Sequence, residues 1–68
     1  MSPDLRNKYD QKITVIDGTL YRRGNIVQVF WDIASPQTWH LSNENAAIVK
    51  IKELSEDFNQ EPDFQLDF

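Results

Sequence analysis

The residues from Glu53 to the end of this 68-residue chain have the clearest chemical pattern. They hold six carboxylates and no Lys or Arg, whereas residues 1–52 hold all seven basic residues and five acids. The formal charge is therefore 7 − 5 = +2 before residue 53 and −6 from there on, which sums to the net −4. Asp-Phe pairs recur at 57–58, 63–64 and 67–68. Carboxylates spaced by aromatic rings favour docking on a surface that is both basic and apolar.

We expect the contacts with a partner to come from this acidic segment. The predicted contact residues are Glu56, Asp57, Phe58, Asp63, Phe64, Leu66, Asp67 and Phe68. A solvated acidic end would explain the carboxylates but not the apolar side chains among them. Two interpretations explain both: the segment packs back on its own body, facing Arg22 and Arg23, or it is a linear docking motif.

Two resemblances bear on the kind of partner. Gln65-Leu66-Asp67-Phe68 resembles the bacterial sliding-clamp-binding motif, Gln-Leu-Ser/Asp-Leu-Phe, but lacks the Leu before the final Phe. An acidic end that closes on Phe is also similar to the C-terminal tip of bacterial single-stranded-DNA-binding proteins, which recruits partner proteins. Both resemblances imply a larger protein partner from nucleic-acid-processing machinery.

Catalytic chemistry has little support in the sequence. His40 is the single histidine, and no serine lies in the strained turn that exposes a nucleophile. One histidine with scattered acids is not a metal-ligand spacing, and two glycines form no phosphate-binding loop. The adjacent acids Glu56 and Asp57 would need a walled pocket to tune their pKa values. We expect no enzyme activity, no metal and no cofactor.

The alternative function is a small nucleic-acid-binding module with the acidic tail as an intramolecular competitor. Its predicted contacts are Arg22, Arg23, Lys50 and Lys52, with exposed aromatic rings stacking on bases. Three strands followed by a helix, over Thr19 to Phe58, resemble the arm-type DNA-binding domain at the N-terminus of tyrosine recombinases. Those domains usually carry a basic sheet, whereas the segment from Ile26 to Asp32 has no Lys or Arg.

A hairpin is predicted early in the chain. Lys12–Ile16 is rich in β-branched residues, and Asp17-Gly18 follows it before Thr19–Arg22. Asp-Gly favours a type I′ turn, in which both central residues have positive φ. Residues 23–25 predict a second turn, because Gly and Asn tolerate left-handed φ.

A third strand is predicted from Ile26 to Asp32, with Val27, Val29 and Trp31 facing the core. Pro36 lies in the loop that follows. A short fourth strand is then expected at Thr38–Leu41.

A helix is predicted after Ser42 or Asn43, either of which can cap free backbone N–H groups. Its apolar stripe is Ala47, Ile51, Leu54 and Phe58, at helical spacing. Residues 46–54 also alternate in part like a strand. In that case residues 23–29 resemble the opening strand of small SH3-like barrels.

The sequence therefore predicts an α+β fold: a small antiparallel meander of three to four strands covered by one C-terminal helix, with an SH3-like small β-barrel as the alternative. We expect a polar lead-in at 1–11, a single domain at 12–58 and the acidic tail at 59–68. The chain has no Cys and no apolar N-terminal run, which favours a cytoplasmic protein. No membrane association is expected. A homo-oligomer is possible, because association of copies would add buried apolar area to a core this small. We expect a protein-interaction domain, acting as an adaptor or inhibitor of a larger, basic-surfaced machine.

Overall fold

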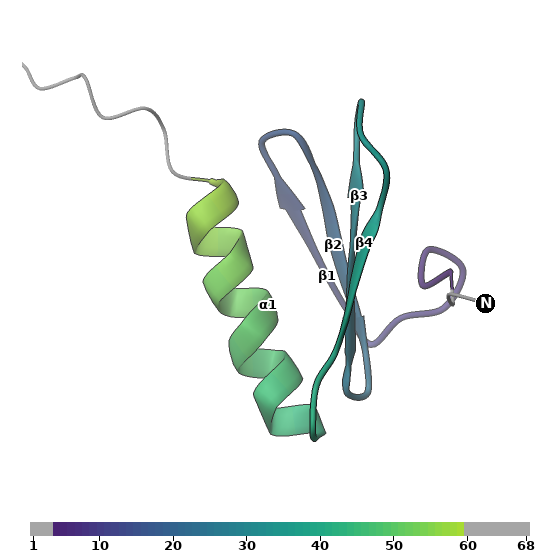
Figure 1. Ribbon diagram of the computed structural model, residues 1–68, viewed down its shortest axis with the longest axis vertical. Helices are drawn as coiled ribbons and strands as arrows, with labels where there is room; N and C mark the ends of the chain where they lie inside the picture. Colours follow the sequence, from purple (N-terminus) through teal and green to yellow (C-terminus); the bar gives the residue numbers. More distant parts are fainter. Residues whose placement is uncertain (1–3, 60–68) are drawn as a thin grey trace, which may run out of the picture.

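The computed structural model describes residues 4–59, which form one four-stranded sheet and one helix (Figure 1). The strands follow the chain order across the sheet, and every neighbouring pair is antiparallel. Their bounds are β1 Gln11–Val15, β2 Gly18–Arg23, β3 Ile26–Trp31 and β4 Gln37–His40, followed by α1 Glu44–Phe58. The predicted meander with one C-terminal helix is confirmed. The sheet stays open, so the alternative of a closed SH3-like barrel is wrong.

The first hairpin forms, but its turn lies one residue earlier than predicted. Val15 pairs with Gly18, which leaves Ile16 and Asp17 as the loop. Neither these two residues nor Gly18 has positive φ, so the type I′ assignment is wrong. Gly18 has a different role, because a Cβ built on it would lie 2.6 Å from the carbonyl oxygen of Phe30. Its lack of a side chain lets β2 and β3 approach each other.

The second turn is the one that requires a left-handed residue. Gly24 has a φ of 58°, and Asn25 beside it has negative φ. Positive φ at the first central position alone is the pattern of a type II′ turn, which matches the twist of a two-residue hairpin. The Gly24 backbone N–H also donates to Asp10 Oδ2 at 2.8 Å.

The helix begins where the sequence predicts. Asn43 is extended, and its side chain accepts a hydrogen bond from the backbone N–H of Ala46 at 2.8 Å. The helix then continues without a break to Phe58, so the competing interpretation of residues 46–54 as a strand is wrong. Val49, which does not fit the helical stripe, faces solvent and is 54% exposed.

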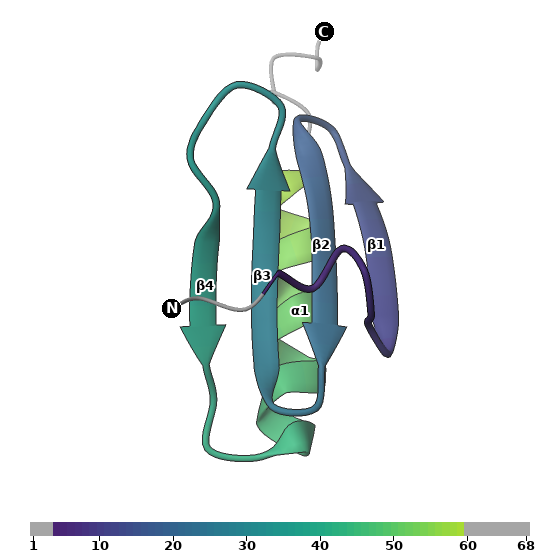
Figure 2. The same ribbon diagram turned by 90° about the vertical axis from the view of Figure 1, so that its right-hand side faces the viewer.

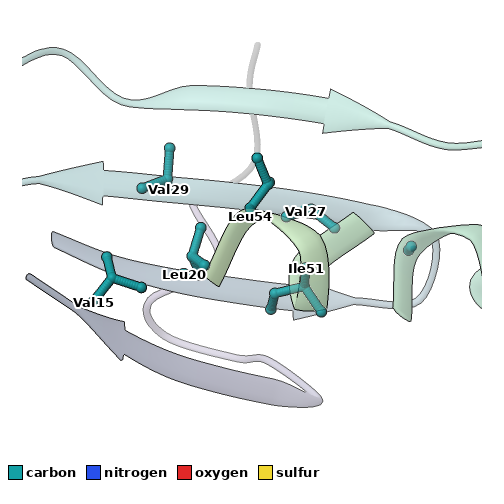
Figure 3. Packing of buried hydrophobic residues seen from close by; sticks show 7 residues of the cluster. Val15, Leu20, Val27, Val29, Ile51 and Leu54 are labelled. Carbon is teal, nitrogen blue, oxygen red and sulfur yellow. The ribbon is translucent and has the colours of Figure 1, made fainter. Parts of the chain in front are cut away.

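One layer of apolar side chains between the sheet and α1 forms the core (Figure 3). Leu20, Val27 and Val29 from the sheet have no exposed surface, and Ala47 and Ile51 from the helix have none either. The alternation predicted for β3 is confirmed, since Val27 and Val29 face α1. The partly buried side chains around this layer are Ile13, Trp31, Trp39, Leu41 and Phe58.

The N-terminal segment 4–10 crosses the opposite face of the sheet, in front of β3 and β2 (Figure 2). Leu5 is 2% exposed there, and its backbone N–H donates to Gln28 Oε1 at 3.0 Å. Gln28 in turn donates to the Thr38 hydroxyl on β4 at 2.9 Å. The segment predicted as a polar lead-in is therefore anchored to the sheet by one buried leucine.

Candidate functional site

The acidic half of α1 is presented to solvent. Glu53, Glu56 and Asp57 are all exposed, and the last turn of the helix contains no basic residue. Carboxylates in the last turn face the partial negative charge at the helix C-terminus, which is an unfavourable arrangement. The end of α1 is thus a fixed acidic surface without a compensating cation of its own in that turn.

Phe58 differs from its acidic neighbours because it packs on the domain. Its ring meets the Trp31 ring edge to face, with centroids 4.6 Å apart and an angle of 73° between the planes. This contact holds the end of α1 against the end of β3. The other predicted contacts, Asp63, Phe64, Leu66, Asp67 and Phe68, lie outside the described residues.

The four basic residues predicted for nucleic acid do not form one surface. Arg22 is 7% exposed and lies on the helix side of the sheet. Arg23 follows it in β2, is exposed and belongs to the opposite side. On α1, the Lys50 ammonium lies 5.6 Å from the centre of the Trp39 ring, and Lys52 is exposed.

Arg22 is held by an internal network. Its Nε donates to Gln11 Oε1 at 2.9 Å, and its Nη1 donates to the Gly24 carbonyl at 2.9 Å. The same Nη1 lies 3.3 Å from Glu44 Oε2 and 3.9 Å from Asp10 Oδ2. These contacts join the start of β1, the second turn and the start of α1. The Arg22 guanidinium therefore links elements of the fold and is not presented to solvent.

The face of the sheet opposite α1 carries a chain of aromatic contacts. The Tyr9 ring meets the Tyr21 ring at 5.1 Å, and Tyr21 meets Phe30 edge to face at 5.8 Å. The Arg6 guanidinium carbon lies 4.2 Å from the centre of the Phe30 ring. Tyr9 is the most open of the three rings, at 42% exposure.

Two cations flank these rings. Lys12 is the direct partner of Tyr21 across the β1–β2 ladder, and Arg23 follows Tyr21 by two residues on the same face. Both are exposed, and neither takes part in an ion pair with another residue of the segment 4–59. We call Tyr9, Lys12, Tyr21 and Arg23, together with Phe30, the sheet-face cluster.

The nearby acids Asp4 and Asp10 have partners of their own. Asp4 Oδ2 accepts from Arg6 Nη2 at 2.7 Å, and the hydrogen bonds from the Arg6 side chain and backbone lower the pKa of Asp4 from 3.8 to about 2. Asp10 accepts from Gly24 and lies near Arg22. Both carboxylates are directed at partners within the domain, namely Arg6, Gly24 and Arg22.

Sequence reasoning missed Tyr9 and Lys12 as site residues. Two members of the cluster carried a signal in the sequence: Arg23 was predicted as a nucleic-acid contact, and Phe30 is an apolar residue on the face of β3 that does not look into the core. Tyr21 shares that face across the ladder, which follows once the register is known. Nothing local in residues 4–10 indicates that Tyr9 returns to the sheet.

Within residues 4–59 the structure has no pocket and no group of three or more His, Cys, Asp and Glu side chains that could bind a metal. His40 is exposed on β4. Among the same residues, no helix is long and apolar enough to cross a membrane. Two surfaces of the described residues gather charged side chains, namely the acidic end of α1 and the sheet-face cluster.

Comparisons of the chain with protein-family models, with curated proteins and with solved structures find no match.

Proposed function

We propose that this protein is a non-enzymatic interaction domain that docks on a basic, partly apolar surface of a larger protein. The docking element is the acidic segment that starts at Glu53. As an adaptor or inhibitor, the protein would be held to its target by this segment. The target would be a protein that handles nucleic acid, because a surface that binds phosphates also attracts carboxylates.

The observation that carries this proposal is the last turn of α1. Glu56 and Asp57 are exposed there without a basic neighbour in the turn, at the end of the helix that disfavours negative charge. A cationic partner would turn this unfavourable arrangement into an attraction. The stability lost in the free protein would then be recovered in the complex.

Phe58 gives the segment a fixed origin. Because its ring packs on Trp31, the end of α1 is held at a defined place on the domain, beside the acidic turn. The sequence beyond it supplies Phe64, Leu66 and Phe68 as apolar side chains between carboxylates. Steering by charge and anchoring by a few large apolar side chains is a common way to bind a partner.

The test is quantitative affinity capture from the source cells, read by mass spectrometry, with the full chain as the reference. Removing residues 60–68 keeps Asn59, whose backbone N–H closes the helix on the Ser55 carbonyl at 3.1 Å. Specific partners should be lost with this deletion and with a Phe64→Ser, Phe68→Ser double variant. Ile33→Ser is the matched control, since Ile33 is 98% exposed and lies in the β3–β4 loop.

A second pair of measurements separates docking from folding. The double variant Glu56→Gln, Asp57→Asn removes the charges that oppose the helix dipole. The melting temperature of the free protein should therefore rise slightly, while the capture of partners weakens. Partners that bind the deletion variant as tightly as the full chain would contradict the proposal.

A further inference from the structure

We propose that the sheet face opposite α1 binds a single strand of nucleic acid. In this site Tyr9 stacks on a base, and Lys12 and Arg23 contact the phosphates. The site lies on the face of the sheet away from α1 and its acidic end. It can therefore be tested independently of the proposed docking function.

The ring contacts provide the stacking surface. Tyr21 and Phe30 are held edge to face by the β2–β3 ladder, and Tyr9 rests on Tyr21 from the N-terminal segment. Tyr9 is 42% exposed, and Leu5 anchors its segment to the sheet. An exposed ring whose position is already fixed can stack on a base with little loss of side-chain freedom.

The two cations stand where phosphates would pass. Lys12 lies beside Tyr21 across the β1–β2 ladder, and Arg23 lies two residues further along β2 on the same face. Among residues 4–59 no carboxylate pairs with either cation. The nearby acids Asp4 and Asp10 are engaged by Arg6, Gly24 and Arg22. Cations beside exposed rings are the combination that single-strand binding proteins use.

The shape of this face favours a strand of bases over other anionic partners. No pocket is found in the described part of the chain, so an acidic peptide would find no hole for an apolar anchor. A duplex keeps its bases stacked inside the helix and cannot offer them to Tyr9. Unpaired bases are planar and need only a ring to lie on.

The experiment measures fluorescence anisotropy of a labelled oligothymidylate of about ten nucleotides with the full chain at low salt. We expect Lys12→Glu, Arg23→Glu to weaken binding by at least about tenfold and to flatten its salt dependence. Tyr9→Ala should weaken binding roughly tenfold, because one base loses its stacking ring. A duplex of the same length should bind more weakly than the single strand.

Two controls match these variants. Lys52→Glu makes the same charge change as Lys12→Glu but on exposed α1, and it should leave the affinity within about twofold. Tyr9→Phe keeps the ring and should bind as the wild type does. Circular dichroism checks that each variant is folded, since the substituted side chains lie outside the core between sheet and helix.

Three results would overturn the proposal. One is the absence of binding by the full chain at low salt. Another is an equal loss in Lys52→Glu and in the single variant Lys12→Glu, which would mean attraction to charge without a site. The third is displacement of the oligonucleotide by a peptide of residues 59–68 at similar affinity, which would make this face a peptide site.

Discussion

The two faces of the four-stranded sheet are covered in different ways. On one face α1 lies along the sheet, and the side chains of Leu20, Val27 and Val29 between the two layers are fully buried. On the other face, the segment 4–10 is the only part of the described residues 4–59 that crosses the strands, and Leu5 is the single buried apolar side chain of that segment. The first face is a continuous core, whereas the second is a partly open surface of rings and cations.

This difference follows from the small size of the described fold. A fold that spans residues 4–59 buries a limited apolar area, so its core is concentrated in one interface. The second face needs only enough cover to protect the middle of the sheet, where Gln28 is 2% exposed. The remaining rings can then serve binding without being needed for the core. Substitutions on the two faces should therefore differ in their effect on stability.

The largest effect is expected on the helix side. Leu20→Ala removes a fully buried side chain from the centre of β2 and leaves a cavity, which should lower the free energy of unfolding by about 3–4 kcal/mol. Urea unfolding followed by circular dichroism measures this loss. Ile33→Ala, at a side chain 98% exposed, should change it by less than about 0.5 kcal/mol. A small loss in Leu20→Ala would mean that the layer beneath α1 is loosely packed.

The next effect tests how tightly the strands on that side approach. Gly18→Ala places a Cβ 2.6 Å from the Phe30 carbonyl and 3.1 Å from the Trp31 ring, so β2 and β3 must separate. We expect a loss of about 2 kcal/mol. A Cβ added at Gly24 meets no atom within 4 Å, but the residue keeps a φ of 58°. Gly24→Ala should therefore lower the free energy of unfolding by about 1 kcal/mol, from backbone strain alone. Equal losses at the two glycines would argue against the close contact at Gly18.

On the opposite face, Leu5→Ala makes the same chemical change as Leu20→Ala. The segment 4–10 can detach without unfolding the sheet, so the loss should be smaller, about 1–2 kcal/mol. Hydrogen exchange should show faster exchange of the Leu5 amide, which donates to Gln28, while the amides of β2 and β3 stay protected. A loss as large as that of Leu20→Ala would remove the distinction between the two faces.

The smallest effect concerns the ion pair that orders this segment. Arg6 lowers the pKa of Asp4 to about 2, below the 3.8 of an unperturbed carboxyl group. A lowered pKa in the folded state stabilises the contact above pH 3.8, and this contribution is lost as the pH falls through about 2. An NMR titration of the Asp4 carboxyl should therefore show a midpoint near 2 in the wild type. In Arg6→Gln the midpoint should return toward 3.8, and an unchanged midpoint would assign the shift to another cause.

Local patterns were sufficient to predict the strands and the helix. The alternation of Val27 and Val29 and the stripe of Ala47, Ile51 and Leu54 each mark one apolar face, and the cap before Glu44 marks the helix start. The sequence predicts Asp17-Gly18 as the central residues of the first turn, whereas the structure has Ile16-Asp17 there. The predicted and the observed register both put Val15 and Leu20 on the same face of the sheet. Apolar alternation cannot distinguish two registers that differ by one residue on each strand.

The candidate sites depended on contacts that no local pattern specifies. Arg22 and Arg23 are adjacent in sequence, yet one is buried in a network and the other is exposed on the opposite face. The contact of Tyr9 with Tyr21 depends on the anchoring of the N-terminal segment, in which Leu5 is buried and its backbone N–H donates to Gln28. The acidic end of α1 could be predicted because charge and helical spacing are both local.

The position of α1 after the strands also bears on how the chain folds. Among the described residues, α1 supplies the apolar partners of the row formed by Leu20, Val27 and Val29. Any state in which α1 has not yet docked exposes this row, and Arg22 then lacks Glu44. Exposed apolar surface of this kind lets partly folded chains associate with one another. Rapid formation of the helix, favoured by the cap at Asn43, shortens the time during which such chains can associate.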